Sequence, residues 1–407
     1  MFLALQAPLT LERKAEIFTY DLEARFRIEG QVAPKLRVAT GSYNMPDNCY
    51  MTGIYLGTEA LRLAVTRDPR ALANVEGALA ALERLEAVTG TPGFLARAYW
   101  PVAHGPHGDD GEWSKSPDGR YLWRGDVSND QVTGFLYGAS LAFDLGPAAL
   151  RPRIALLVAR VVDRIQANGR QIVDAAGKVT TWGRYDRDYV VNREPMNALL
   201  WLQHLAVARQ VTGEERFRKL YEETARRDAY ARFALVARKA TDPLKAGSVN
   251  HSDDVLLFLA YLPLFRLEKT AELRDLYLRS LDRTWREVAV EENPFFTYVH
   301  RAATGDRSHD AAARRTLELF PFDLKWNRLT IAGYERRFGF RSDALPRSAA
   351  PARPGVVPID RRPRLWSAWA NDPYVAGSRE TDGAMEYQAL DFLMAYWLGR
   401  YTGAFQE

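Results

Sequence analysis

Pairs of helical segments recur along almost the whole chain, and this recurrence restricts the fold more than any other feature of the sequence. Apolar residues at helical spacing mark each segment, and proline or glycine separates the two members of most pairs. A single helix over Leu11–Glu29 comes first. The predicted pairs are Thr52–Val65 with Arg70–Thr89, Asn129–Leu145 with Ala149–Asn168, Pro195–Val211 with Glu214–Ala231, and Ser252–Leu267 with Thr270–Val288. Further helices are predicted over Arg307–Leu319 and Ala384–Tyr401.

Helical hairpins of this length and number predict an all-α fold of the (α/α)6 toroid class, in which an outer ring of helices covers an inner ring. The predicted toroid is a single domain over residues 1–407, with at most a short β-hairpin of Arg170–Val173 and Lys178–Trp182. The Pro-, Ala- and Arg-rich residues 345–364 are predicted to form a surface loop. Successive pairs are spaced more widely than the roughly 20–50 residues of common solenoid repeats, although an open helical solenoid remains the structural alternative.

Composition excludes several classes of protein. The 407 residues are 47% hydrophobic and 26% charged, which is typical of a globular chain. The net charge is only +4 and the charges are interspersed, without the basic stripe of a nucleic-acid binder. No apolar run reaches the roughly 18 residues that span a bilayer. Nucleic acid and membrane are therefore not the expected partners. Aromatic residues make up 12% of the chain, and many lie in predicted loops, where they either stack on sugar rings or pack against the core. The first of these roles makes a glycan the expected partner.

The single cysteine, Cys49, excludes an internal disulfide and a cysteine-based zinc site. The sequence holds no nucleotide-binding loop, dinucleotide fingerprint or zinc motif, so we expect no metal and no cofactor. The first nine residues are apolar but lack the basic start and the cleavage site of a signal peptide. The compartment stays open between cytoplasmic and, if a leader has been removed, periplasmic or secreted. The oligomeric state also stays open.

Polar clusters precede the first helix of each pair, and in a toroid these loops converge on one end of the barrel. The first cluster contains Asp47 and Asn48, which could bind substrate or cap the helix at Thr52. The second contains Asp126 and Asp130 and is read as catalytic. Its alternative role is helix capping, with Asp130 compensating the helix dipole. Trp123 and Arg124 precede this pair as candidate substrate-binding residues.

Further clusters add aromatic, basic and acidic side chains. Aromatic rings stack on sugars and arginine can hold a carboxylate through two hydrogen bonds. The predicted substrate-binding residues here are Trp182, Arg184, Tyr185, Arg193, Asn250, Asp382 and Glu386. The segment from Asn250 to Asp254 is the most specific, because His251, Asp253 and Asp254 exceed what capping requires. These three are predicted to be catalytic.

Four segments resemble the landmarks of an uncharacterised bacterial toroid family: Asp47–Thr52, Gly125–Gln131, Thr181–Tyr185 and Asn250–Asp254. The last matches its landmark fully. The first has Cys49 where that family has an acidic residue, and the second ends in Gln131 where an acid is expected. The wider toroid class is similar to glycoside hydrolases and polysaccharide lyases, and the two losses point to a changed or lost activity.

The sequence favours a glycoside hydrolase, because hydrolysis needs one carboxylic acid and one carboxylate, and Asp126 or Asp130 opposite Asp253 or Asp254 supplies them. A polysaccharide lyase on a uronate is the first alternative. Its base would be His251 or Tyr185, with Arg193 and Asn250 on the substrate carboxylate. A non-catalytic glycan-binding or scaffold protein is the second alternative, favoured by Gln131.

Overall fold

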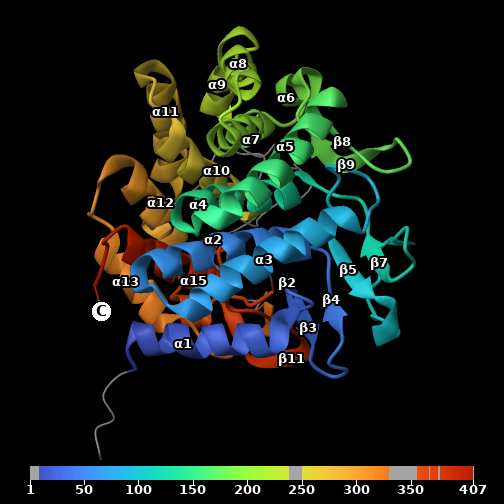
Figure 1. Ribbon diagram of the computed structural model, residues 1–407. Helices are drawn as coiled ribbons and strands as arrows, with labels where there is room; N and C mark the ends of the chain where they lie inside the picture. Colours follow the sequence, from blue (N-terminus) through green and yellow to red (C-terminus); the bar gives the residue numbers. More distant parts are fainter. Residues whose placement is uncertain (1–8, 238–249, 330–354, 366, 375, 407) are drawn as a thin grey trace, which may run out of the picture.

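A computed structural model describes residues 9–237, 250–329, 355–365, 367–374 and 376–406. These residues are mainly helical, as predicted (Figure 1). The helices are α1 (Leu11–Asp21), α2 (Asn48–Thr66), α3 (Pro69–Ala87), α4 (Asn129–Leu145), α5 (Arg151–Ala167), α6 (Arg187–Asn192), α7 (Met196–Thr212), α8 (Glu215–Glu222), α9 (Tyr230–Phe233), α10 (Ser252–Leu267), α11 (Ala271–Val288), α12 (Pro294–Thr304), α13 (Asp310–Leu319) and α15 (Leu390–Tyr401). None of these helices is long and apolar enough to cross a membrane.

Six of the described helices contact one another in a closed sequence. α2 packs on α4, α4 on α7, α7 on α10, α10 on α12, α12 on α15, and α15 returns to α2. We call these the inner helices, because they are buried nearly all round: in α7, every residue from 196 to 208 is buried. The outer helices α1, α3, α5, α8, α11 and α13 each pack against an inner helix, as α3 does along α2 in Figure 1.

Each outer helix packs against the inner helices through a stripe of apolar residues along one face. In α5 the buried residues recur at helical spacing, and the rest of the helix faces solvent. They are Ile154, Leu157, Val158, Val161, Val162 and Ile165. Sequence periodicity locates such helices well. It locates α12 poorly, because α12 is short and buried on all sides, and it is absent from the predicted pattern.

The helices α2 and α4 approach more closely than side chains allow. A Cβ atom added to Gly138 would lie 1.9 Å from the Gly53 carbonyl oxygen, and one added to Gly53 would lie 2.4 Å from the Gly134 carbonyl carbon. Only glycine lets two helix backbones touch in this way. The crossing of α2 and α4 therefore depends on these three residues and on Gly57, whose added Cβ would lie 2.8 Å from the Tyr137 ring.

Strands form four small antiparallel sheets in the described residues, so the prediction of at most one short hairpin is wrong. The predicted hairpin itself is present as β8 (Gln171–Val173) and β9 (Val179–Arg184). The other sheets pair β1 (Arg27–Ile28) with β2 (Gln31–Val32), place β7 (Tyr121–Arg124) between β5 (Ala98–Pro101) and β6 (Trp113–Lys115), and order β10 (Lys325–Leu329), β11 (Gly377–Tyr387), β3 (Lys35–Arg37) and β4 (Tyr43–Asn44). Residues 384–387 belong to β11 rather than to the last helix, which begins at Leu390.

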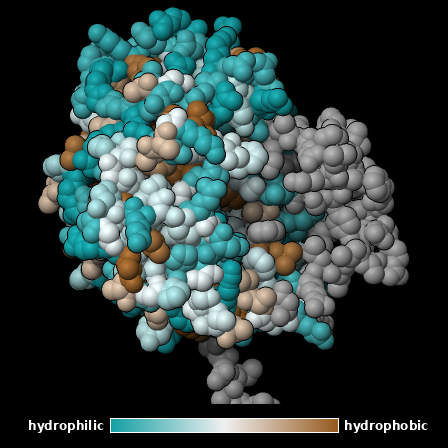
Figure 2. Space-filling view, turned by 90° about the vertical axis from the view of Figure 1, so that its right-hand side faces the viewer, coloured by the Kyte–Doolittle hydropathy of each residue, from teal (hydrophilic) through white to brown (hydrophobic). Residues whose placement is uncertain are grey.

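Strands β5, β7, β8 and β9 lie on the right of Figure 1, and Figure 2 shows that side as a mostly hydrophilic surface with scattered hydrophobic side chains. Part of the predicted surface loop, residues 345–354, lies outside the described residues. In the described remainder, Ile359 and Arg362 are buried.

We predict that Gly138→Ala lowers the free energy of unfolding by about 1–3 kcal/mol, because the added methyl group has no space against the α2 backbone. Chemical denaturation measures the change. Gly77→Ala in α3 is the control: its added Cβ meets only the flexible end of Arg27, and alanine favours a helix over glycine by about 1 kcal/mol. Equal stability of Gly138→Ala and the wild type would contradict the close crossing.

Candidate active site

Carboxylates at the beginnings of four inner helices act on one tyrosine. Burial raises the pKa of Tyr50, at the start of α2, well above its ordinary value, and the charges of Asp130, Asp391, Asp47 and Asp253 raise it further. These carboxylates come from the beginnings of α4, α15, α2 and α10. We call Asp47, Asp130, Asp253 and Asp391 the carboxylate cluster.

Within this cluster, Gln131 joins two carboxylates. Its side-chain nitrogen lies 3.2 Å from Asp47 Oδ1 and 3.4 Å from Asp130 Oδ1, so that it donates to both. Its side-chain oxygen accepts from the Tyr50 backbone N–H at 3.1 Å. Asp130 Oδ1 also accepts from the Ser128 hydroxyl and from the Gln131 backbone N–H. Gln131, where the resemblance led us to expect an acid, is therefore an amide that hydrogen-bonds to two carboxylates.

Burial raises the pKa of Asp47, and the nearby charge of Asp130 raises it further. Arg97, Lys35 and the hydrogen bond from Gln131 act in the opposite direction without cancelling the rise. The Asp47 side chain nevertheless stays 29% exposed. Asp47 is thus an accessible carboxyl group that retains its proton to higher pH than an ordinary aspartate, as a general acid must.

Arg97 binds the two loops that carry these acids. Its guanidinium donates to the Pro46 carbonyl oxygen (2.9 Å), Asp47 Oδ1 (3.2 Å), the Asp126 carbonyl oxygen (2.6 Å) and Ser128 Oγ (2.7 Å). Sequence analysis missed Arg97, because a single arginine before a short strand carries no motif. Its hydrogen bonds fix the start of α2 relative to the start of α4.

Asp126 is exposed and adopts a left-handed backbone conformation, with φ of 48°. Its Oδ1 accepts from the Thr181 backbone N–H at 2.9 Å, so the side chain ties the loop before α4 to β9. Trp182, the next residue of β9, is 58% exposed. The Asp126 carboxylate thus ties the loop before α4 to β9, and the ring of Trp182 is exposed to solvent.

His251 is held between two carboxylates and is only 2% exposed. Its Nδ1 lies 2.7 Å from Asp254 Oδ2, and its Nε2 lies 2.7 Å from Glu291 Oε2. Burial disfavours the charged ring, but Glu291 and Asp254 outweigh burial and raise the pKa of His251 to about 9. His251 is therefore an imidazolium at neutral pH. Glu291, which precedes α12, escaped sequence analysis because that helix did.

Several predicted substrate-binding residues are committed to other contacts. Asn48 is buried and donates to Gln31 Oε1 at 3.3 Å, and Trp123 is buried edge-on against Phe94. Arg124 pairs with the buried Asp109 at 2.5 Å. Asn250 is exposed, and its Oδ1 accepts from the Ser252 backbone N–H.

The remaining predicted residues lie at the end of β9, just after β9 and α6, and in β11. Arg184 pairs with Asp186 at 3.0 Å, and Arg193 is exposed. Tyr185 is fully buried with its hydroxyl 3.1 Å from His204 Nε2, and burial raises the pKa of Tyr185 well above its ordinary value. Glu386 pairs with Arg25 at 2.5 Å. Asp382 belongs to β11, and its side chain lies outside the described residues.

Comparison with known proteins gives little guidance. No family model matches the chain, and no curated protein matches it. One similar solved structure is a sugar epimerase from a ruminal bacterium, 12% identical, with a TM-score of 0.43, covering 75% of this chain and 84% of that one. A likeness of this degree carries no argument about activity. Among the described residues, no group of three His, Cys, Asp or Glu side chains is placed to hold a metal ion.

We predict that His251 makes stability depend on pH. Because its pKa is raised from 6.5 to about 9, its stabilisation is complete below pH 6.5 and is lost as pH rises through about 9. The free energy of unfolding should fall by about 2–3 kcal/mol over this range in the wild type, and much less in His251→Asn. Denaturation at a series of pH values measures this. His104→Asn, at an exposed histidine, should behave as the wild type does, and a wild-type decline retained in His251→Asn would refute the assignment.

Proposed function

We propose that the protein is a carbohydrate-active enzyme, a glycoside hydrolase built as a toroid of α/α hairpins. The closed sequence of inner helices, each covered by an outer helix, supports the toroid. The pair Asp47 and Asp130, joined by Gln131 at the beginnings of α2 and α4, is the observation that carries the activity.

The two acids take different roles in this proposal. Burial and the charge of Asp130 raise the pKa of Asp47, which favours its protonated form, so in this proposal Asp47 protonates the leaving glycosidic oxygen. Asp130, oriented by Ser128 and Gln131, acts as the carboxylate that activates water or attacks the sugar. Arg97 keeps both loops in place. Trp182 follows the residue that Asp126 binds, and its exposed ring is available for stacking on a sugar.

A hydrolase is favoured over a lyase because the candidate bases of the lyase are unsuitable. A lyase needs a base that removes a proton next to the uronate carboxyl group. His251 is already protonated at neutral pH, and Tyr185 is fully buried with a pKa well above its ordinary value. The carboxylate cluster would also repel an acidic sugar, which further supports a substrate without uronate groups.

We expect Asp47→Asn and Asp130→Asn each to lower hydrolysis by roughly 10²-fold or more, since each removes a group that acts on the scissile bond. Release of reducing ends from a panel of neutral and uronate-containing glycans measures activity, and near-ultraviolet absorbance detects the unsaturated product of a lyase. Asp118→Asn, at an exposed carboxylate in the β6–β7 turn, is the matched control.

Full activity in either acid variant would remove the assignment of that residue, and absorbance rising with the reducing ends would identify a lyase. Binding of a glycan without either signal would favour the non-catalytic alternative.

The pH profile tests the role of Asp47 separately. The charge of Lys35 holds the pKa of Asp47 down, so Lys35→Gln should raise that pKa and move the alkaline limb of kcat/KM to higher pH. Lys115→Gln, at an exposed lysine of β6, should leave the limb in place. An unmoved or lowered limb in Lys35→Gln would show that a group other than Asp47 supplies the proton.

A further inference from the structure

Ser128 occupies the N-cap position of α4, the residue directly before the helix, but its side chain does not cap the helix. A serine at this position normally accepts a hydrogen bond from a backbone N–H of the first turn. Here the hydroxyl oxygen instead accepts from Arg97 Nη2 at 2.7 Å, and the hydroxyl donates to Asp130 Oδ1. Ser128 is buried, so it can influence a substrate only through other residues.

The chemistry of these groups fixes the direction of both hydrogen bonds. A guanidinium group has donors and no acceptor, so Arg97 donates to the Ser128 oxygen. A hydroxyl has a single hydrogen, and that of Ser128 is directed at Asp130 Oδ1. Hydrogen bonds in a chain polarise one another, so accepting from a cation strengthens the bond that the hydroxyl donates. The positive charge of Arg97 therefore favours negative charge on Asp130 through Ser128.

The two oxygens of each acid have different surroundings. Asp130 Oδ1 accepts from the Ser128 hydroxyl, from the Gln131 backbone N–H at 2.9 Å and from the Gln131 side-chain nitrogen at 3.4 Å. Asp47 Oδ1 accepts from Arg97 and from the Gln131 side-chain nitrogen, each at 3.2 Å. Neither Oδ2 atom accepts a hydrogen bond from any residue that the structure describes, and both side chains are partly exposed. Both acids are thus held by Oδ1, which leaves Oδ2 available to a substrate.

We propose that Ser128 and Arg97 are positioning residues of the hydrolysis proposed above, on which this inference rests, and that they keep Asp130 ionised with its Oδ2 toward the sugar. Hydrogen bonds to the charged form of a group favour that form, so the three donors on Oδ1 favour the carboxylate. When Asp47 is protonated, its proton lies on Oδ2, because Oδ1 already accepts from two groups that only donate.

These two oxygens then carry the reaction. The bond between the anomeric carbon and the glycosidic oxygen breaks, and its electron pair stays on the oxygen, which takes the proton from Asp47 Oδ2. Asp130 Oδ2 either accepts a proton from the water whose oxygen attacks the carbon or attacks the carbon itself. In the second case, water releases the sugar from Asp130 and returns a proton to Asp47.

Other titratable groups act on Asp130 directly or share Tyr50 with it. They are Asp47, Cys49 and Tyr50 at the start of α2, Tyr185 after β9, Asp253 of α10 and Asp391 of α15. Burial raises the pKa values of Cys49, Tyr50 and Tyr185, so these three side chains are uncharged at neutral pH. The other three are acids. Arg97 is therefore the cation that favours the ionised form of Asp130 within this group.

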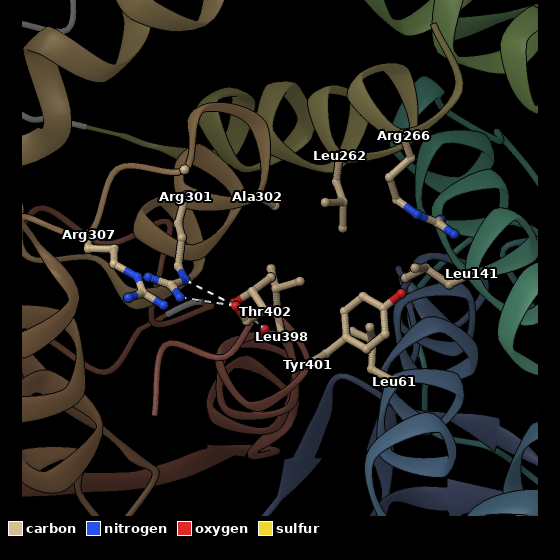
Figure 3. A pocket seen from close by; sticks show the side chains of 11 residues that line it. Leu61, Leu141, Leu262, Arg266, Arg301, Ala302, Arg307, Leu398, Tyr401 and Thr402 are labelled. Carbon is tan, nitrogen blue, oxygen red and sulfur yellow. Dashed lines mark hydrogen bonds between the residues drawn. The ribbon is translucent and has the colours of Figure 1, made fainter. Parts of the chain in front are cut away.

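Arg301 shows what an arginine does when it only joins helices. It lies at the opposite end of the inner helices, where its guanidinium donates to the Thr402 carbonyl oxygen at 3.1 Å (Figure 3) and to Asp310 at 2.5 Å. Arg97 differs because one of its acceptors, the Ser128 hydroxyl, donates in turn to an acid of the proposed reaction. Arg301 therefore provides a control for the loss of structural contacts alone.

Ser128→Ala tests the inference through the pH dependence of glycan hydrolysis. A carboxylate that loses a donor takes up a proton more easily, so the acidic limb of kcat/KM should move to higher pH, while the alkaline limb, which reports Asp47, stays in place. At neutral pH, kcat should fall by roughly tenfold, as expected for the loss of one charged hydrogen bond, and KM should not change. Ser128→Thr keeps the hydroxyl and should restore the wild-type profile.

The controls are Ser114→Ala, at an exposed serine of β6, and Arg301→Gln. Ser114→Ala should match the wild type, and Arg301→Gln should lower the free energy of unfolding without moving either limb. An acidic limb that stays in place in Ser128→Ala would overturn the inference, as would an equal shift in Ser128→Thr.

A second measurement does not depend on hydrolysis. NMR follows the carboxyl carbon of Asp130 in isotope-labelled protein, and Asp130→Asn identifies its resonance. Direct observation is needed because burial raises the pKa of Asp391 to about 6, so an acidic limb alone could report that acid. The titration midpoint of Asp130 should lie at higher pH in Ser128→Ala than in the wild type. An unmoved midpoint would overturn the role of Ser128 even in an active enzyme. A moved midpoint in a protein that hydrolyses no glycan would support the chain from Arg97 to Asp130 and refute the proposed hydrolysis.

Discussion

The glycine contact between α2 and α4 is the constraint on which the candidate active site depends. Gly53 and Gly134 meet just after the first turns of their helices, and a Cβ on Gly134 would lie 2.8 Å from the Tyr50 carbonyl oxygen. At this separation the side chain of Gln131 reaches the Tyr50 backbone and both Asp47 and Asp130. A wider crossing, as larger residues would impose, would place the two acids beyond the reach of one amide.

Buried charged groups also connect the N-terminal ends of the inner helices α10 and α12. The ion cluster of His251, Asp254 and Glu291 joins the start of α10 to the turn before α12. Desolvating three charged groups is costly, and their mutual attraction recovers that cost only when the geometry is good. Such a cluster favours one relative arrangement of α10 and α12, because only that arrangement satisfies all three groups. His251 thus positions the backbone near Asp253, one of the carboxylates around Tyr50.

The limits of sequence analysis follow from the range of each interaction. Helices with one apolar stripe, such as α5, can be predicted from the spacing of their apolar residues along the chain. The strand β11 does not, because it pairs with β3 and β10, and Met385 opposite Arg37 joins residues far apart in the chain. The residues of the candidate site also fall into those that the sequence indicates and those that it does not. Asp47 and Asp130 stand in polar clusters visible in the sequence, whereas Arg97 and Glu291 gain meaning only through contacts with distant loops.

The common direction of the inner helices also explains the chemistry of their two ends. Backbone dipoles favour negative charge at helix N-termini and positive charge at C-termini. Carboxylates accordingly gather at the first turns, and Arg266 and Arg301 lie in the last turns of α10 and α12. Asp47 departs from this trend, since a helix N-terminus should help it to ionise, yet burial and Asp130 raise its pKa. A helix cap alone does not require a second carboxylate beside the first, and the Asp47 side chain makes no capping hydrogen bond at the start of α2. Under the proposed function, the raised pKa of Asp47 is the property that a proton donor needs.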